Sequence, residues 1–226
     1  MVDLYLFDLD GTLIDITDFH VDAYEIAYKS VFDVEVSRNL LESKFGKTEI
    51  QAHKEICNEL KIKYEKYQIQ KIIDLWESNV IEKIRRSNNV RALKGVREFL
   101  EELKLREIPC CITTANSESI ASLLINKSGL VKYFQFFNYG DDVNDRVEIL
   151  KEAIKKFKRE GHDIKRVIII GDTISDIKAG KGVGAYTVGV ATGHQDINIL
   201  RSARADLVLG SLEEYEKIFE GLRVKS

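Results

Sequence analysis

The sequence predicts an α/β protein, with a doubly wound, Rossmann-like parallel sheet as its core and an inserted all-helical domain. Two observations predict this fold class. Short apolar runs of strand length alternate with segments whose apolar residues recur at helical spacing, which is the pattern of βαβ units. Residues 15–85, directly after the first apolar run, show only helical periodicity. We therefore expect a core domain of residues 1–14 and 86–226 and a helical cap domain of residues 15–85.

Six apolar runs are the expected strands. The clearest are residues 4–7, 108–113, 166–170 and 185–190, and two weaker ones are residues 134–138 and 205–209. The run at 166–170 is nearly all β-branched, which is typical of a parallel strand covered on both faces. Right-handed crossovers between such strands place their carboxyl ends along one edge, where open α/β sheets bind ligands.

Helical spacing of apolar residues links these runs. In the core, the helical segments lie around residues 96–103, 120–124 and 147–157. In the insert, helices are expected around residues 19–27, 51–60 and 69–80. We expect Tyr24 and Trp76 to belong to the interior of the helical domain, and His53 to lie on its surface.

Composition limits the class of protein. The chain has 226 residues, of which 44% are apolar and 31% charged, with a net charge of −3. These values fit a folded globular protein and argue against disorder or a basic nucleic-acid-binding face. The three cysteines have no CxxC spacing, so neither a disulfide framework nor a zinc site is indicated. Without a signal-peptide pattern or a membrane-length apolar run, we expect a cytoplasmic protein with no membrane partner, as a monomer or homodimer.

Two acids follow the first expected strand, in Asp8-Leu9-Asp10-Gly11-Thr12. Residues i and i+2 of an extended segment point to the same side, so Asp8 and Asp10 should leave the strand end together. Two close carboxylates repel each other unless a proton or a cation lies between them, and a hard divalent ion suits oxygen ligands. The alternative is a solvated Asp-Gly turn.

Polar residues follow two further strands. Gly171-Asp172-Thr173-Ile174-Ser175-Asp176 puts Asp172 at a strand tip and Asp176 about one helical turn later. Acids that merely favour a helix amino terminus are the alternative, above all for Asp176. Thr113-Thr114-Ala115-Asn116-Ser117 offers hydroxyls and free backbone N–H groups at a helix start, which can hold a phosphate, with Ser117 as the N-cap.

Together these motifs resemble those of the haloacid dehalogenase superfamily of phosphohydrolases. The chain is similar to the helical-cap subclass, which includes phosphatases of the phosphoglycolate phosphatase and β-phosphoglucomutase-like type. The first motif, DxDGT, matches residues 8–12, the second matches Thr113, and the fourth, GDxxxD, matches residues 171–176. The resemblance extends from about residue 3 to Gly193 and includes the helical insert after the first motif.

The resemblance implies roles for the acids. Asp8 would be the nucleophile, forming an aspartyl-phosphate, and Asp10 the general acid and then the general base. Mg²⁺ would be held by the Asp8 carboxylate, the main-chain carbonyl of Asp10 and the carboxylate of Asp172. Asp176 would support the metal site.

The resemblance also implies phosphate ligands. Thr113 and the amide of Thr114 would bind phosphate oxygens. The usual lysine of the third motif is absent from residues 140–148, and Arg146 is the candidate cation. The alternative is that Arg146 pairs with Asp142 or Asp145 while another cation, such as Lys151, binds phosphate.

One histidine in the insert matches the family less closely. His20 stands ten residues after Asp10, where similar enzymes often have a histidine at the hinge by the active site. A solvated histidine on a helix surface is the equal alternative.

The leading functional hypothesis is a Mg²⁺-dependent phosphomonoester hydrolase acting on a small phosphorylated metabolite. A β-phosphoglucomutase-like sugar phosphomutase is the first alternative, although Lys47-Thr48-Glu49 follows Gly46 where such a mutase should have an arginine. Asp10 argues against a haloacid dehalogenase, which lacks an acid at that place. A non-catalytic binding protein would be expected to have lost an essential acid, and here none is missing.

Overall fold

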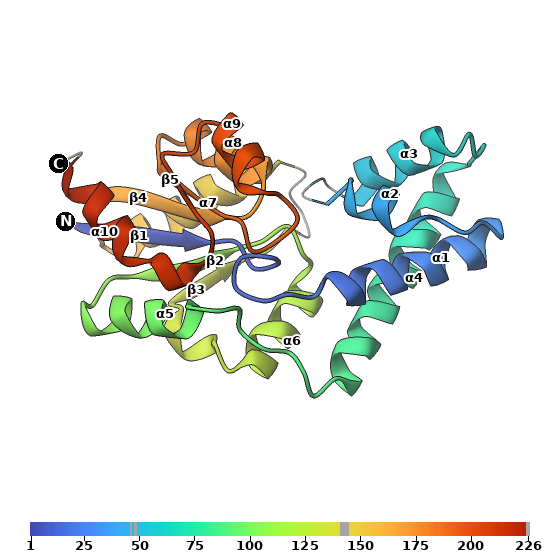
Figure 1. Cartoon of the computed structure of the whole chain (residues 1–226). Coiled ribbons are helices and arrows are strands. Elements are labelled where there is room, and N and C mark those ends of the chain that lie inside the picture. Colours follow the sequence, from blue (N-terminus) through green and yellow to red (C-terminus); the bar gives the residue numbers. More distant parts are fainter. Residues whose placement is uncertain (46, 48, 141–144, 225–226) are drawn as a thin grey trace. The chain divides into compact units, whose positions relative to one another are not determined.

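The computed structural model describes residues 1–45, 47, 49–140 and 145–224. The chain divides into two compact units: Met1–Asp15 with Arg91–Ser226, and Ile16–Val90 (Figure 1). The expected insert, residues 15–85, differs from the second unit by one residue at its start and five at its end. The later end has a local cause, because the chain on both sides of the insert pairs within the first unit. The N–H of Leu93 donates to the carbonyl of Leu13 at 2.9 Å.

The first unit contains one six-stranded sheet, as the sequence predicts. Its strands, all parallel, are β1 (Val2–Phe7), β2 (Cys110–Thr113), β3 (Phe136–Asn138), β4 (Ile164–Gly171), β5 (Tyr186–Val190) and β6 (Leu207–Leu209). Their order in space is β3-β2-β1-β4-β5-β6, so β1 and β4 lie in the interior of the sheet. The weaker runs at 134–138 and 205–209 supply the two edge strands.

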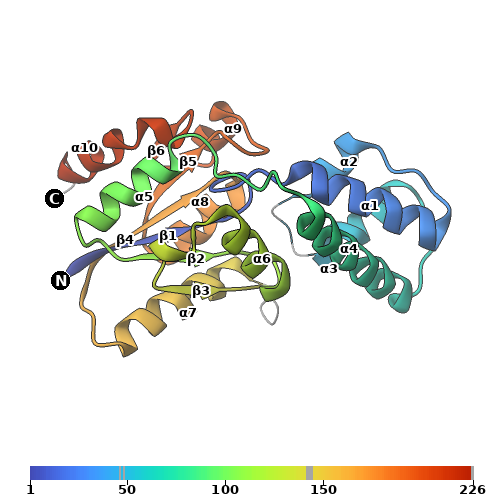
Figure 2. The same ribbon diagram turned by 90° about the horizontal axis from the view of Figure 1, so that it is seen from below.

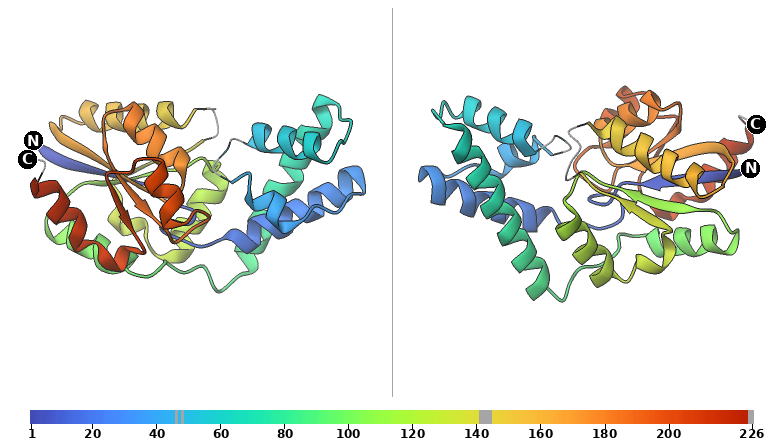
Figure 3. Two further views of the ribbon diagram at one scale, coloured as in Figure 1. Left: turned by 45° about the horizontal axis from the view of Figure 1, so that its top comes forward. Right: turned by 180° about the vertical axis from the view of Figure 1, so that it is seen from behind.

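Helices cover both faces of this sheet (Figures 2 and 3). On one face lie α5 (Val96–Leu105), α6 (Glu118–Ser128) and α10 (Glu216–Val224), and on the other lie α7 (Arg146–Arg159), α8 (Ile174–Gly182) and α9 (Ile197–Ser202). Short 3₁₀ turns at Val131–Tyr133 and Leu212–Glu214 complete the connections. None of the described helices combines the length and the apolar character needed to cross a membrane.

The first strand shows why its sequence is a continuous apolar run. Leu4 and Leu6 belong to the buried cluster beneath α7 and α8. Tyr5 and Phe7 point to the opposite face, where both rings make edge contacts with Phe99 of α5 at 5.9 Å. Because both faces are covered, every position of the strand favours an apolar side chain.

The second unit consists of α1 (Thr17–Phe32), α2 (Arg38–Glu42), α3 (Glu49–Glu59) and α4 (Lys66–Arg86). The three longer helices are those that the apolar spacing predicts. The five-residue helix α2 is too short to show a period, and Ser37 begins it by accepting a hydrogen bond from the N–H of Leu40. At the start of α4, Gln68 accepts a hydrogen bond from the N–H of Glu65 at 2.9 Å, as part of a capping box.

Candidate active site

The register of the sheet brings the predicted motifs to one edge. Phe7 of β1 pairs with Ile112 of β2 on one side and with Ile170 of β4 on the other. The next residues along these strands, Asp8 and Thr113, therefore lie at the same level, and Asp172 follows at the end of β4. The N–H of Asp8 donates to the carbonyl of Ile170 at 2.9 Å, which keeps the acid next to β4.

The carboxylate of Asp172 is enclosed by three segments. Its side chain is 1% exposed. Oδ1 accepts a long hydrogen bond from the hydroxyl of Thr12 at 3.4 Å, and Oδ2 accepts one from the N–H of His194 at 3.1 Å. A Cβ on Gly11 or Gly193 would overlap this carboxylate, and Gly11 also has a φ of +75°. The two glycines thus leave the space in which Asp172 lies.

Asp176 is held by the start of α8. Its Oδ2 accepts hydrogen bonds from the hydroxyl and the N–H of Thr173, at 2.6 and 3.0 Å. Thr173 in turn accepts a hydrogen bond from the N–H of Asp176, which makes a capping box. A Cβ on Gly171 would overlap the Asp176 carboxylate. Asp176 is therefore both a helix-capping residue and a buried acid. Its second carboxylate oxygen, Oδ1, takes no part in the capping box.

Arg146 connects these acids. It is the first residue of α7, and Asp145 caps that helix by accepting a hydrogen bond from the N–H of Val147 at 2.9 Å. The Nη2 atom of Arg146 forms ion pairs with Oδ1 of Asp8 and with Oδ1 of Asp176. Burial acts to lower the pKa of Arg146, but Asp176 and Asp8 outweigh it and raise that pKa above its ordinary value. Arg146 therefore remains a cation within this group.

The alternative was that Arg146 pairs with Asp142 or Asp145 while Lys151 binds phosphate, and the structure bears on part of it. Lys151 pairs with Glu148 at 2.6 Å on the exposed side of α7. Asp145 caps the helix. Asp142, like the neighbouring Asp141, lies outside the described residues.

The carboxyl groups at this site outnumber Arg146, the cation that contacts them. Burial raises the pKa of Asp8 to about 7; Arg146 acts to lower it, whereas Asp176 and Asp10 raise it further. Burial likewise raises the pKa of Asp172, and the charges of Asp8 and Asp176 add to this. A further positive charge would relieve this repulsion.

Three of these carboxylates form a group suited to a metal ion. One oxygen from each of Asp8, Asp172 and Asp176 lies within 4.8 Å of the others. Carboxylate oxygens and excess negative charge are what a hard divalent cation requires. The side chain of Asp10 is not part of this group among the described residues, which leaves its main-chain carbonyl as the ligand expected from the sequence.

The Asp10 side chain faces the loop after β2. Its Oδ2 accepts a hydrogen bond from the side-chain amide of Asn116 at 2.7 Å. Asn116 lies within the segment of the second motif, but no role for it could be predicted from the sequence. Its position in a loop at a strand end could have marked Asn116 as a site residue. Its partner could not be recognised, because Asp10 is 106 positions away in the sequence.

The two threonines of the second motif have different surroundings. Thr113 is buried, and its hydroxyl donates to the carbonyl of Phe7 at 3.4 Å. The expected role of the Thr114 amide in binding phosphate does not fit this arrangement, because that N–H donates to the carbonyl of Asn138 at 3.1 Å. The hydroxyl of Thr114 accepts a hydrogen bond from the N–H of Asn116. Thr114 therefore shapes the loop, with Ser117 at the N-cap of α6.

His20 belongs to the second unit. It lies on α1, and its ring stacks on Trp76 at 5.3 Å. Tyr24 also stacks on Trp76, with the two ring centroids 5.2 Å apart. Both Tyr24 and Trp76 are buried, as expected, but the expectation for His53 was wrong: it is 0% exposed, with Nδ1 3.0 Å from the hydroxyl of Tyr28. The hydroxyl of Tyr28 that faces this ring belongs to α1, so the sequence around His53 does not reveal the partner that allows its burial.

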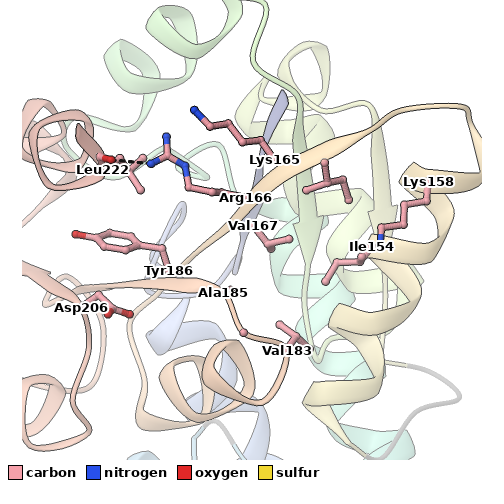
Figure 4. Close-up of a pocket in the computed structure, with 12 residues that line it drawn as sticks. Ile154, Lys158, Lys165, Arg166, Val167, Val183, Ala185, Tyr186, Asp206 and Leu222 are labelled. Atoms are coloured by element: carbon pink, nitrogen blue, oxygen red, sulfur yellow. Dashed lines mark hydrogen bonds between the residues drawn. The ribbon is translucent and has the colours of Figure 1, made fainter. Parts of the chain in front are cut away.

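A pocket of about 500 Å³ lies at the amino-terminal ends of β4 and β5, opposite the strand ends that carry the acids (Figure 4). Its walls include Lys165 and Val167 near the start of β4, Tyr186 at the start of β5, and Lys158 on α7. None of the residues predicted from the motifs lines it. It is thus separate from the acids, which stand at the carboxyl ends of the strands.

Comparison with known proteins agrees with this arrangement. The profile of the family described as "Haloacid dehalogenase-like hydrolase" matches residues 5–190. A phosphoglycolate phosphatase of Neisseria meningitidis is 26% identical over 226 residues, covering 96% of this chain and 92% of the relative. The pyrophosphatase PpaX of Oceanobacillus iheyensis is 25% identical over 209 residues, covering 92% of each.

Solved structures show the same fold. The β-phosphoglucomutase of Clostridium difficile superimposes with a TM-score of 0.84, covering 100% of this chain and 99% of that chain, at 20% identity. At this identity the likeness is one of fold.

Proposed function

The chain belongs to the haloacid dehalogenase-like hydrolase family as a phosphatase-type enzyme, and we propose that it hydrolyses phosphomonoesters of small metabolites through an aspartyl-phosphate on Asp8. The observation that supports this most directly is the group at the sheet edge. A buried Asp8 carboxylate contacts one guanidinium and lies within 4.8 Å of two further acids. A carboxylate so placed can face a phosphate only when cations neutralise the shared negative charge.

In the first chemical step, an oxygen of the Asp8 carboxylate attacks phosphorus, and the bond from phosphorus to the ester oxygen breaks. The leaving oxygen takes a proton from Asp10, so the alcohol departs neutral and Asp10 becomes a carboxylate. Arg146 binds the phosphate oxygens and stabilises their charge as the geometry around phosphorus changes. Thr113, at the end of β2, donates to the same phosphate once its hydroxyl turns from the carbonyl of Phe7, to which it makes a long hydrogen bond of 3.4 Å.

In the second step, a water molecule attacks the phosphorus of the aspartyl-phosphate. Asp10 accepts the proton of that water, and the bond from phosphorus to the Asp8 oxygen breaks. Inorganic phosphate leaves, the Asp8 carboxylate is restored and Asp10 is protonated again, so the cycle closes.

The donor set fits Mg²⁺, with the carboxylates of Asp8 and Asp172 and the main-chain carbonyl of Asp10 as ligands and Asp176 in support. When bound, this ion supplies positive charge between the acids and the phosphate. The hydrogen bonds from Thr12 and His194 orient Asp172 for this purpose. Thr173 does the same for Asp176.

The second unit is proposed to act as the cap that selects the substrate, with His20 near the hinge between the units. Solution scattering with and without Mg²⁺ and a phosphate analogue tests this, because a closing cap makes the molecule more compact. An unchanged scattering profile would contradict a mobile cap.

The decisive experiment measures phosphate release from 4-nitrophenyl phosphate with and without Mg²⁺. The wild type should turn over only with the metal, and Asp8→Asn should reduce turnover to background. Asp163→Asn, which makes the same change at an exposed aspartate of the first unit, should retain activity. Turnover that survives Asp8→Asn would exclude Asp8 as the nucleophile.

A panel of substrates then separates the remaining candidates. It contains phosphoglycolate, pyrophosphate and β-glucose 1-phosphate, since relatives named for the first two are 26% and 25% identical to this chain. A phosphomutase would convert the sugar phosphate to its isomer without releasing phosphate. Phosphate release from a member of the panel supports the hydrolase.

A further inference from the structure

We propose that Asn116 is the positioning residue for Asp10: its side-chain amide holds the carboxyl group of Asp10 in the orientation required for proton transfer to the leaving oxygen. The inference rests on the proposed function, in which Asp10 is the acid. Asn116 belongs to the loop after β2, whereas Asp10 follows β1. Its effect on the rate should be seen only with substrates whose leaving oxygen must be protonated.

The contact itself is specific. The Nδ2 atom of Asn116 donates to Oδ2 of Asp10 at 2.7 Å. The direction of this hydrogen bond is determined by chemistry, because an amide nitrogen only donates. One oxygen of Asp10 is thus engaged by the amide.

The loop leaves Asn116 little freedom. Its N–H donates to the hydroxyl of Thr114 at 3.1 Å, and its carbonyl accepts from the N–H of Gly140 at 2.9 Å. A Cβ on Gly140 would overlap the main chain of Ala115, so the two loops are packed against each other. Because both backbone groups of Asn116 are hydrogen-bonded, its backbone is fixed before substrate binds. Its side chain therefore contacts Asp10 from a preorganised position.

The main chain of Asp10 is anchored within its own segment. Its main chain is bridged to Ile14, and the N–H of Gly11 donates to the carbonyl of Ile14 at 2.8 Å. These contacts determine where the backbone of Asp10 lies, and the amide of Asn116 acts on its side chain. Among the hydrogen bonds to the Asp10 side chain that the described residues show, that from Asn116 comes from a part of the chain 106 positions away.

A positioning residue for a general acid has a kinetic signature that a structural residue lacks. A leaving oxygen of low basicity, as in 4-nitrophenyl phosphate, departs with little protonation, whereas the more basic oxygen of phenyl phosphate needs the acid. The test compares kcat/KM for these two esters, with Mg²⁺ present. This parameter reports phosphoryl transfer to Asp8, before the aspartyl-phosphate is hydrolysed.

For Asn116→Ala, we expect kcat/KM on phenyl phosphate to fall by roughly 10–100-fold, part of the ~10²–10⁴-fold that general acid catalysis supplies. On 4-nitrophenyl phosphate it should change by less than about 3-fold. Asn116→Asp, which keeps the shape but cannot donate when ionised, should show the same selective loss and serves if the alanine variant is unstable. Asn126→Ala is the matched control, since it removes an exposed amide that donates to the carbonyl of Ser122 on α6.

A double-mutant cycle gives the second readout. If Asn116 acts through Asp10, then Asn116→Ala should have little further effect in an Asp10→Asn background. Equal losses on the two esters, no loss on either, or full additivity with Asp10→Asn would overturn the proposal. A wild type that hydrolyses neither ester would instead refute the proposed function, and this inference with it.

Discussion

The Nη2 atom of Arg146 forms an ion pair with Oδ1 of Asp8, 138 positions earlier in the chain, and the same atom contacts Oδ1 of Asp176. One guanidinium thus connects the first residue of α7 with the end of β1 and the first turn of α8. The side chain of Arg146 is 14% exposed, and we propose that it serves as the cation in place of the third-motif lysine that residues 140–148 lack. A planar guanidinium can contact two acids, or an acid and a phosphate, at the same time.

Replacement of Arg146 should therefore reduce activity without a change of fold. We expect Arg146→Ala to lower kcat/KM on 4-nitrophenyl phosphate by about 10²–10³-fold, the usual effect of removing one donor that stabilises transition-state charge. Arg146→Lys restores the charge but not the fork, so it should recover part of this loss. Lys151→Ala, on the exposed side of the same helix, is the control. If only the Lys151 variant lost activity, Lys151 and not Arg146 would be the cation that binds the phosphate.

The stabilising effect of Mg²⁺ should depend on pH. Because burial raises the pKa of Asp8 from 3.8 to about 7, the folded metal-free protein holds a proton in that range which the unfolded chain has released. Its stability therefore falls as pH rises from about 4 to 7. Mg²⁺ competes with this proton, so the increase in Tm on adding Mg²⁺ should be larger at pH 8 than at pH 5. Equal increases at the two pH values would contradict the assignment of Asp8 as a ligand, and Asp8→Asn should weaken the difference.

Gly193 should be needed for metal binding. Alanine at this position places a Cβ on the carboxylate of Asp172, which must then move away from its hydrogen bond with the N–H of His194. We expect a loss of Mg²⁺ affinity of about 10–100-fold, as is usual when the support of a ligand is disturbed, measured by calorimetry. Gly210→Ala, where the nearest atom is the end of the flexible Glu214 side chain, should bind Mg²⁺ as the wild type does. Unchanged affinity in Gly193→Ala would show that Asp172 is not a ligand.

Trp76, the single tryptophan of the chain, provides a probe of the second unit. His20→Ala removes a ring that stacks on it at 5.3 Å, and should lower the free energy of unfolding by about 1–3 kcal/mol. Urea titration followed by tryptophan fluorescence measures this. Tyr67→Ala, which removes an exposed ring from α4 of the same unit, should shift the same transition much less. A His20 variant with an unchanged midpoint would show that its ring does not stabilise this unit.

The sequence was a good guide to the fold because the relevant forces are local or periodic. A strand covered on both faces must be apolar along its length, so residues 4–7 and 166–170 could be recognised without any knowledge of their neighbours. The five-residue helix α2 could not, since a segment of that length shows no period. His53 was misplaced for a related reason: the hydroxyl of Tyr28 on α1, which satisfies its ring, comes from another helix.

By itself, the sequence determined which acids gather at one edge. Asp8 and Asp172 directly follow buried strands, and parallel strands bring their carboxyl ends together. What those acids contact was decided by tertiary structure alone. The partnership of Arg146 with Asp8 and that of Asn116 with Asp10 join residues 138 and 106 positions apart. A long or freely turning side chain has many conformations of similar energy, and only packing against distant segments selects one of them.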